Sequence, residues 1–417
     1  MGKITIKILA AALMIIILTG LTGCDNAENE TVAIDKADFK AGAIFVGDGS
    51  EAYTAALVEG IEKAAKETGL SENQIVIKYS VDDSSACLDA ASELVKEGCN
   101  IVITGSYSQQ SYMQLAASEL KNTHFVAMTG DTANQSKLPN FSNAFTKIYE
   151  ARYISGVVAG MKIKELEEDG KLSDANKDSV GNIRVGYIGA FPYAEVVSGY
   201  TAFFLGVQSV VPEVVMEVQY TNSWFDVKAE TEAAKALIFD GCVVIGQHTD
   251  SKGIPVAIQD ALQKGTEVYS VGYNVDMLSV APDAVLTSAT NDWSVFFTYL
   301  FNAVINGEKV ATDWAEGYET GAVAITELGQ SCAAGTQEKV DETIAAIKEG
   351  SLHVFDTGRF TVEGKVLESY RIDLDGDLLC DDNNEDAEAI KDGYFHESEL
   401  RSAPAFDIRI DGITEVN

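Results

Sequence analysis

Basic side chains are scarce in this 417-residue chain, which has 30 Lys and Arg against 64 Asp and Glu, a formal net charge of −34, and four His. A charge of this sign and size repels phosphate backbones and argues against nucleic acid as a partner. Only His248 lies in a candidate binding loop, so a metal site built from histidines has little support and we expect none. No run of 18 or more apolar residues follows residue 20, which argues against a transmembrane helix.

The sequence signatures of common enzyme classes are also missing. We find no HExxH, no G-x-S-x-G, no Walker A lysine and no complete G-x-G-x-x-G after a strand, since Gly47-Asp-Gly49 is followed by Ala52 where the third glycine would stand. The acids Asp250 and Asp276 are a carboxylate pair of the kind used in acid–base chemistry, but nothing in the sequence brings them to one bond. We expect binding without catalysis and without a cofactor.

The first 24 residues have the three-part form of an export signal. Lysines precede an apolar run, Ile8–Gly20, that is too short to span a bilayer permanently. The next four residues, Leu21-Thr-Gly-Cys24, resemble the bacterial lipobox, in which the cysteine is lipidated. We expect residues 1–23 to be a lipoprotein signal peptide, Cys24 to be the lipid anchor on the extracytoplasmic face of the cell membrane, and the polar residues 24–38 to be a flexible tether. The alternative is an ordinary secretory leader that leaves Cys24 as a free thiol.

Export permits disulfides, and the remaining cysteines offer two candidate pairs. Cys87 begins a predicted helix and Cys99 follows its end, so these two meet only if the chain folds back; Cys332 with Cys380 is the second candidate pair. Cys242 opens an apolar run, and we expect it to be a buried small apolar residue.

From Gly42 onward, short apolar runs alternate with segments of helical period, which is typical of stacked βαβ units. The expected α/β elements form two similar series, and the length left after residue 23 suits two lobes. The expected strands of the first series are 43–46, 75–79, 101–104 and 125–128; those of the second are 183–188, 214–220, 242–245 and 268–271. A further strand at 284–288, a helix at 293–304, a strand near 321–325 and a helix at 338–348 follow.

One stretch near the end, Asp373–Asp386, is strongly acidic. Asp373, Asp375 and Asp377 alternate as calcium ligands do, but Leu378 occupies the position where an EF-hand loop needs glycine. We expect a solvated acidic loop, with calcium binding as the alternative.

In parallel sheets the ligand crevice lies beyond the carboxyl ends of the strands, so the loops after the strands are the ones that matter. These loops combine aromatic rings with carboxylates and amides and contain no Lys or Arg, which suits a small, planar, polar ligand better than a phosphorylated one. The candidate ligand-binding residues are Asp48, Tyr53, Tyr107, Tyr193, Trp224, His248, Asp250, Asn274, Asp276, Asn291 and Trp293.

Each candidate also has a purely structural interpretation. Asp226, Asp250 and Asp292 stand at helix starts, where a carboxylate caps free backbone amides. For Trp224 and Tyr193 the structural alternative is a rim or core aromatic.

At these loops the chain resembles the basic membrane protein (BMP) family of solute-binding lipoproteins, whose best-known members are purine nucleoside receptors. The resemblance covers roughly Ala41–Lys309 and rests on several motifs in one order: Ile183-Arg-Val-Gly-Tyr-Ile188, Phe204-Leu-Gly206-Val, Asn222-Ser-Trp-Phe-Asp226, Gln247-His-Thr-Asp-Ser251, Gly272-Tyr-Asn-Val-Asp276, Ala281-Pro282 and Leu286-Thr-Ser288.

The resemblance implies a two-lobed type I periplasmic-binding-protein fold, each lobe a doubly wound parallel sheet, with three hinge crossings. The lobes expected from it are residues 39–147 plus 275–311 and residues 148–274 plus 312–417, the second including the acidic tail. It further implies a purine nucleoside or purine base bound between the lobes and delivered to the permease of an ABC importer.

Carried over by position, Tyr53 stands where the family's first-loop ring stacks on the base, and Asp276 matches an acid that holds ribose hydroxyls. Asn274 replaces the first acid of that loop, Thr54 replaces an asparagine, and an expected lysine is absent, which leaves Asn291 or Trp293 in its place. These departures favour a purine base over a nucleoside. The alternatives are another small polar solute such as a vitamin or sugar, a sensing subunit for a membrane partner, and, third, an enzyme that modifies nucleosides.

Overall fold

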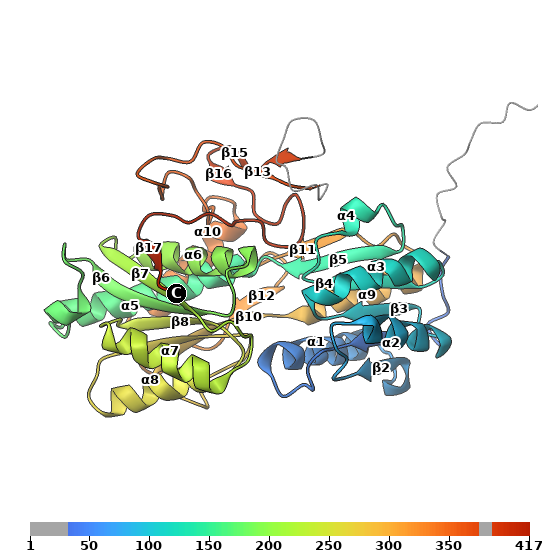
Figure 1. The fold of residues 1–417 in the computed structure, drawn as a ribbon, viewed down its shortest axis with the longest axis horizontal. Helices are drawn as coiled ribbons and strands as arrows, with labels where there is room; N and C mark the ends of the chain where they lie inside the picture. Colours follow the sequence, from blue (N-terminus) through green and yellow to red (C-terminus); the bar gives the residue numbers. More distant parts are fainter. Residues whose placement is uncertain (1–31, 375–385) are drawn as a thin grey trace, which may run out of the picture.

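The computed structural model describes residues 32–374 and 386–417. The expected signal peptide, Cys24, the start of the tether, most of the acidic stretch and Cys380 therefore lie outside the described residues. In the described part, two β-sheets lie side by side, each covered by helices, and the last segment of the chain lies along one side of both (Figure 1).

The first sheet has six parallel strands in the order β11-β5-β4-β3-β1-β2. The strand β1 is apolar and buried at every position because helices cover both faces of a parallel sheet. The strands are β1 (Ala41–Ile44), β2 (Ile75–Lys78), β3 (Ile101–Thr104), β4 (His124–Met128), β5 (Phe141–Thr146) and β11 (Asp313–Glu316), and the helices are α1 (Ala52–Thr68), α2 (Ser85–Lys96), α3 (Gln110–Glu119), α4 (Ala133–Ser136) and α9 (Trp293–Asn306), with short 3₁₀ turns at Glu72–Gln74 and Tyr107–Gln109.

The second sheet has seven strands in the order β12-β10-β9-β8-β6-β7-β17, parallel except for β12. In each sheet the earliest strand in the chain, β1 or β6, lies between the second strand of its series and the third, so the strand order changes direction there. Ligands of such sheets bind outside the carboxyl ends of the strands at this switch point. The strands are β6 (Ile183–Gly189), β7 (Val214–Tyr220), β8 (Val244–His248), β9 (Tyr269–Tyr273), β10 (Val285–Asn291), β12 (Val323–Ile325) and β17 (Ile413–Glu415), and the helices are α5 (Ile148–Glu168), α6 (Ala194–Gln208), α7 (Val227–Phe239), α8 (Gly253–Gln263) and α10 (Thr336–Lys348), with a 3₁₀ turn at Asp174–Asn176.

The chain passes between the sheets at three places before its last segment: from β5 to α5, from β10 to α9, and from β11 to β12. The sheet pairing differs from the expected lobe boundaries at two strands. β10 pairs with β9 in the second sheet, although 275–311 was assigned to the first lobe, and β11 pairs with β5 in the first sheet, although 312–417 was assigned to the second. The apolar pattern of β10 does not specify which sheet that strand joins, and β11 is too short and polar to be recognised as a strand from its sequence.

Two glycines allow α5 and α6 to pack with their backbones in contact. A Cβ atom at Gly156 would lie 2.1 Å from the carbonyl oxygen of Phe203, and one at Gly206 would lie 2.1 Å from that of Tyr153. Only glycine fits at such a distance. This close contact fixes the start of α5, and with it the side chain of Arg152, against the second sheet.

The last segment contacts both lobes. It adds β17 to β7 at the edge of the second sheet, and it reaches the first sheet where the backbone N–H and hydroxyl of Ser402 donate to Asp313 over 3.0 and 2.8 Å. Its own core contains the stacked rings of Phe355 and Phe406, with centroids 4.3 Å apart. Its short strands are β13 (Arg371–Ile372), β14 (Ala387–Glu388), β15 (Ile390–Lys391) and β16 (Tyr394–Phe395), seen above the two sheets in Figure 1.

All four cysteines of the described residues carry free thiols. The candidate pair of Cys87 with Cys99 is not formed. Cys87 lies in the first turn of α2 and Cys99 follows the end of this helix, so about 13 Å of helix separates the two along the chain. Cys332 is free and its candidate partner lies outside the described residues. Cys242 is buried as predicted, and burial raises the pKa of its thiol.

Candidate functional site

The two sheets lie side by side (Figure 1). Side chains at or after the carboxyl ends of strands in the second lobe act on a ring of the first lobe. The ring of Tyr53 comes from the first turn of α1, and its hydroxyl donates to the carbonyl oxygen of Gly105 over 3.1 Å. Burial, and then the neighbouring charges of Glu195 and Asp250, raise the pKa of Tyr53. Those two acids belong to the second lobe, so Tyr53 of the first lobe lies close enough to feel their charges.

His248, the last residue of β8, lies at the centre of this site and is fully buried. One ring nitrogen is 3.3 Å from a carboxylate oxygen of Glu195 in α6, and the other is 3.4 Å from the hydroxyl of Tyr187. Burial, and next the charge of Arg152, hold the pKa of His248 well below its usual range. The imidazole is therefore neutral, and its contact with Glu195 is a hydrogen bond rather than an ion pair.

Arg152 on α5 contributes a positive charge next to Glu195 and His248. Arg152 itself is 1% exposed, and its guanidinium donates to the carbonyl oxygen of Gln247 over 2.6 Å and lies 3.7 Å from the centre of the Tyr273 ring. Two of its nitrogens, Nε and Nη2, find no hydrogen-bond partner among the described residues. Arg152 thus balances part of the negative charge of Glu195 through space.

Two acids of the second lobe are held at the site in a poorly solvated setting. Burial raises the pKa of Glu195 to about 7 despite the opposing charge of Arg152. Burial also raises the pKa of Asp250 to about 7, against a hydrogen bond of 3.0 Å that Asn274 donates to its carboxylate. Both groups are suited to accept hydrogen bonds from N–H or O–H groups of a ligand, which would replace the missing solvation.

Aromatic rings line the site from both lobes. On the second lobe, Phe191 stacks on Tyr193 with centroids 5.2 Å apart and meets Trp224 edge-on at 5.9 Å, while Trp224 lies 6.3 Å from His248. On the first lobe, Tyr53 meets the buried ring of Trp293 edge-on at 6.4 Å. The indole N–H of Trp293 has no partner among the described residues.

The structure therefore brings together the candidates Tyr53, Trp293, Trp224, His248, Asp250, Asn274 and Asn291, with Tyr193 at the exposed rim. Three candidates lie apart from this group. Asp48 is exposed and accepts from the backbone N–H of Ser50, Tyr107 is half exposed and donates to Asp131, and Asp276 is exposed and accepts from the N–H of Leu278. Each of these three is thus engaged in a contact within its own lobe.

The capping interpretation fits two of the three aspartates at helix starts. Asp226 accepts from the N–H groups of Lys228 and Ala229, and Asp292 accepts from that of Ser294 over 3.1 Å. Asp250 precedes α8 but bonds Asn274 instead, so it is not a cap.

Sequence reasoning missed Arg152 and Glu195, because both project from helices rather than from the loops after strands. Arg152 lies in the largely apolar first part of α5, where the thirteen positions from Ala151 to Ile163 contain two charged residues, Arg152 and Lys162. A charged residue inside a buried helix was the available signal, since such a group needs a partner.

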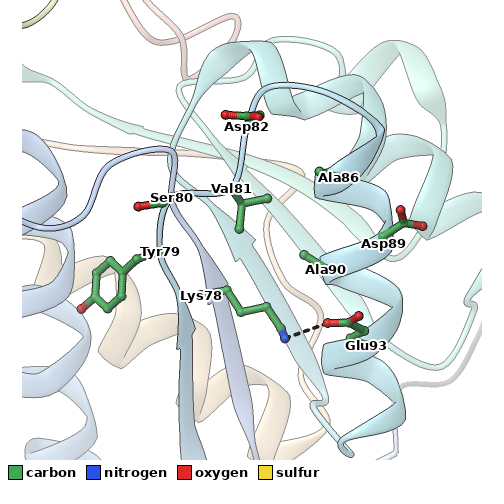
Figure 2. A pocket seen from close by; sticks show the side chains of 9 residues that line it. All are labelled: Lys78, Tyr79, Ser80, Val81, Asp82, Ala86, Asp89, Ala90 and Glu93. Atoms are coloured by element: carbon green, nitrogen blue, oxygen red, sulfur yellow. Dashed lines mark hydrogen bonds and ion pairs between the residues drawn. The ribbon is translucent and has the colours of Figure 1, made fainter.

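An open hollow of about 460 Å³ lies away from this site, beside β2 and α2 (Figure 2). Its one basic group, Lys78, points at Glu93 and forms an ion pair of 2.9 Å with it. The hollow contains none of the candidate residues. Within residues 32–374 and 386–417, no three His, Cys, Asp or Glu side chains are grouped to hold a metal ion, and no helix has the length and apolar character needed to cross a bilayer.

Comparisons with known proteins show the family of the chain. Residues 41–354 match the Bmp family, described as ABC transporter substrate-binding protein PnrA-like. A purine-binding protein of Brucella abortus (strain 2308) is 32% identical over 263 residues, which cover 63% of this chain and 67% of that protein. A putative ABC transporter glucose-binding protein of Haloferax volcanii is 30% identical over 264 residues, 63% of this chain and 61% of that protein. The chain thus spans about two thirds of the first relative and less of the second.

Solved structures share the fold at low sequence identity. An ABC transporter solute-binding protein of Aeropyrum pernix K1 superposes with a TM-score of 0.62 at 13% identity over 76% of this chain and 93% of that one. One from Conexibacter woesei DSM 14684 gives 0.58 at 18% identity over 76% and 98%. The two-lobed periplasmic-binding-protein fold is thereby confirmed.

Proposed function

We propose that this chain, which belongs to the Bmp family of ABC transporter substrate-binding proteins, binds a purine base or purine nucleoside between its two lobes and presents this ligand to an ABC permease. The observation that carries the proposal is the grouping of aromatic rings of both lobes, Tyr53 and Trp224, with the acids Glu195 and Asp250. The purine-binding relative from Brucella abortus supports the same ligand class.

The rings account for the flat part of such a ligand. Tyr53 comes from one lobe and Trp224 from the other, so a purine between them would have its faces buried only when the lobes close. Stacking on an aromatic ring contributes about 0.5 to 1.5 kcal/mol beyond the area it buries. Closure would then be linked to binding, which is the signal a permease reads.

The polar groups account for the edge of the ligand. Asp250 and Glu195 offer acceptors for ring N–H, amino or hydroxyl groups, and the neutral imidazole of His248 adds a group that donates or accepts according to its tautomer. The side-chain N–H groups of Arg152 and Trp293 that have no partner among the described residues are donors for ring nitrogens or a carbonyl of the ligand. A net negative site of this kind disfavours phosphorylated ligands.

A sugar is the second candidate ligand, and the putative glucose-binding relative from Haloferax volcanii favours it. Acids and aromatic rings also bind pyranoses, since hydroxyls donate to carboxylates and the apolar face of the sugar stacks on a ring. The two candidates differ in their ultraviolet absorbance and mass, so the bound molecule itself distinguishes them.

The experiment that tests the proposal is identification of the ligand that co-purifies with the protein. The purified protein is denatured with heat, and the released small molecules are analysed by mass spectrometry and ultraviolet absorbance. We expect a purine or its nucleoside in an amount approaching one per chain. Release of a sugar alone would contradict the purine proposal and support the second candidate.

We further propose that the protein works at the extracytoplasmic face of the cell membrane, held there by a lipid on Cys24. The support is the lipobox-like order of residues 21–24 after an apolar leader. The high net negative charge would keep the two lobes in solution above an anionic membrane surface.

A further inference from the structure

A line of hydrogen bonds runs from the crossings between the lobes to the acid Asp250. Thr146, the last residue of β5, donates to the side-chain oxygen of Asn291, the last residue of β10. Asn291 then donates to the side-chain oxygen of Asn274 over 3.3 Å, and Asn274 donates to Asp250 over 3.0 Å. In each of these bonds the donor is the residue farther from Asp250 along the line. The amide that donates to Asp250 is therefore already oriented by the hydrogen bond that it accepts.

Asn274 is fixed in place by its backbone as well as by its side chain. Its φ of 63° is in the left-handed region, which asparagine tolerates better than most residues other than glycine. Its N–H donates to the carbonyl oxygen of Ala289 over 2.9 Å, and it is 5% exposed. Its amide oxygen accepts from Asn291 while its amide nitrogen donates to Asp250, so the position needs a group that accepts on one side and donates on the other.

The surroundings of Asp250 are already negative. The acids that act on it are Glu230 on α7, Glu195 on α6 and Glu51 before α1, while Tyr53 on α1 and Tyr273 on β9 approach it with neutral hydroxyls. His248 on β8 is neutral as well. No positive side chain forms an ion pair with Asp250 among the described residues, so a further carboxylate beside it would find no counter-charge.

We propose that Asn274 is a positioning residue of the binding site: its amide holds the carboxylate of Asp250 where it accepts from the ligand, and it links that carboxylate to the strand ends where the chain crosses between the lobes. The inference rests on the proposed function for the identity of the ligand. It assigns to Asn274 a role that an acid of the same shape cannot fill.

The decisive variant is Asn274→Asp, which has the same shape as the native residue. It would still accept from Asn291 but would set a second carboxylate about 3 Å from Asp250. Two carboxylates at that distance share one proton, which removes the repulsion between them. As the pH rises the pair loses this proton, and the two negative charges then repel each other. Asn274→Ala is the control that removes the donor without adding charge, and the strain of alanine at a φ of 63° does not depend on pH. The swap Asp250→Asn with Asn274→Asp restores one acid and one amide, and the amide again donates to the acid.

The test measures the Kd for adenine and adenosine by calorimetry at pH 5.5 and pH 8, and the Tm of the unliganded proteins at the same two pH values. Relative to wild type, we expect Asn274→Asp to bind at least tenfold more weakly at pH 8 and within threefold at pH 5.5, with a Tm several degrees lower only at pH 8. We expect Asn274→Ala to be weaker by a similar factor at both pH values. In the swap, the loss of affinity and the drop in Tm that occur only at pH 8 should disappear.

Two results would overturn the inference: wild-type affinity and Tm of Asn274→Asp at pH 8, or a swap protein that keeps the full pH 8 deficit. If wild type binds neither adenine nor adenosine, the proposed function fails, and the Tm comparison alone decides whether Asn274 and Asp250 are coupled as described.

Discussion

Ser198 on α6 donates a hydrogen bond of 2.7 Å to the buried carboxylate of Glu397, which lies in the last segment of the chain. The other oxygen of Glu397 accepts from the N–H groups of Ala405 and Phe406 over 2.9 and 3.0 Å. This one acid therefore joins the second lobe to a segment that lies beyond the family match, which ends at residue 354. Because Ser402 of the same segment bonds Asp313 in the first lobe, the segment connects the two lobes beside their crossings.

The first prediction concerns the pH dependence of stability. Burial raises the pKa of Glu397 to about 7, against the hydrogen bonds that it accepts. A carboxyl whose pKa is raised by folding binds more protons in the folded state, so its contribution is present at low pH and is lost as the pH rises from about 4.5 to about 7. Glu397→Gln keeps the shape and carries no charge, so between pH 5 and pH 8 it should gain about 3 kcal/mol of unfolding free energy relative to wild type.

Urea denaturation of both proteins at pH 5 and pH 8 measures this difference. Equal differences at the two pH values would show that Glu397 keeps its ordinary pKa in the fold.

Loss of the ring of Tyr53 should weaken purine binding. Tyr53→Ala removes a ring that contributes about 0.5 to 1.5 kcal/mol beyond its buried area, so we expect about tenfold weaker binding or more. Calorimetry with adenine and adenosine provides the measurement. The control is Asp292→Ala, which removes a helix cap and should cost about 1 kcal/mol of stability with little change in affinity. Equal affinities of Tyr53→Ala and wild type would place the ligand elsewhere.

A third prediction distinguishes two acids. The family resemblance points to Asp276 as the acid that contacts the ligand, whereas the structure has its carboxylate exposed on the N–H of Leu278 and has Asp250 buried beside Tyr53. We expect Asp250→Ala to weaken binding by about 1 to 3 kcal/mol, since it leaves a buried ligand donor unpaired, and Asp276→Ala to stay within about threefold of wild type. Titration of both variants decides between them. The reverse order would return Asp276 to the site.

The fourth prediction concerns the anchor. Cys24→Ser should release the protein from membranes without changing ligand affinity, because the described end of the expected tether contacts the first lobe at Ile305 and Gln74 rather than at the proposed binding site, so this part is held and is not the flexible tether expected. Fractionation after a carbonate wash, followed by titration of the soluble protein, tests both parts. A variant that still sediments with membranes would be held by something other than a lipid on Cys24.

Much of the fold was predictable, because buried parallel strands are continuous apolar runs and the helices between them have a clear period. β1, β3, β6 and β8 all belong to this kind. β5 was missed because its buried residues include Ser142 and Asn143, whose polar groups are paired inside the sheet. β11 and β17 were missed because they are short and polar and are defined by the strand beside them.

The site was predictable only where its residues follow strands. The rule that ligands bind beyond strand ends gathered His248, Asp250 and Asn274, which the structure brings together. The same rule also included Asp48, whose carboxylate closes its own turn, since position in a loop does not fix the direction of a side chain. Arg152 projects from the helix α5 and not from a loop after a strand, and no local sequence pattern specifies that its guanidinium reaches Tyr273.

The most direct test of the account is calorimetric titration of the wild-type protein, freed of bound ligand by denaturation and refolding, with adenine, adenosine, cytidine and glucose. We predict saturable heat at one site per chain for adenine or adenosine, and none for cytidine or glucose. Heat from glucose with none from either purine would contradict the purine site proposed between the lobes.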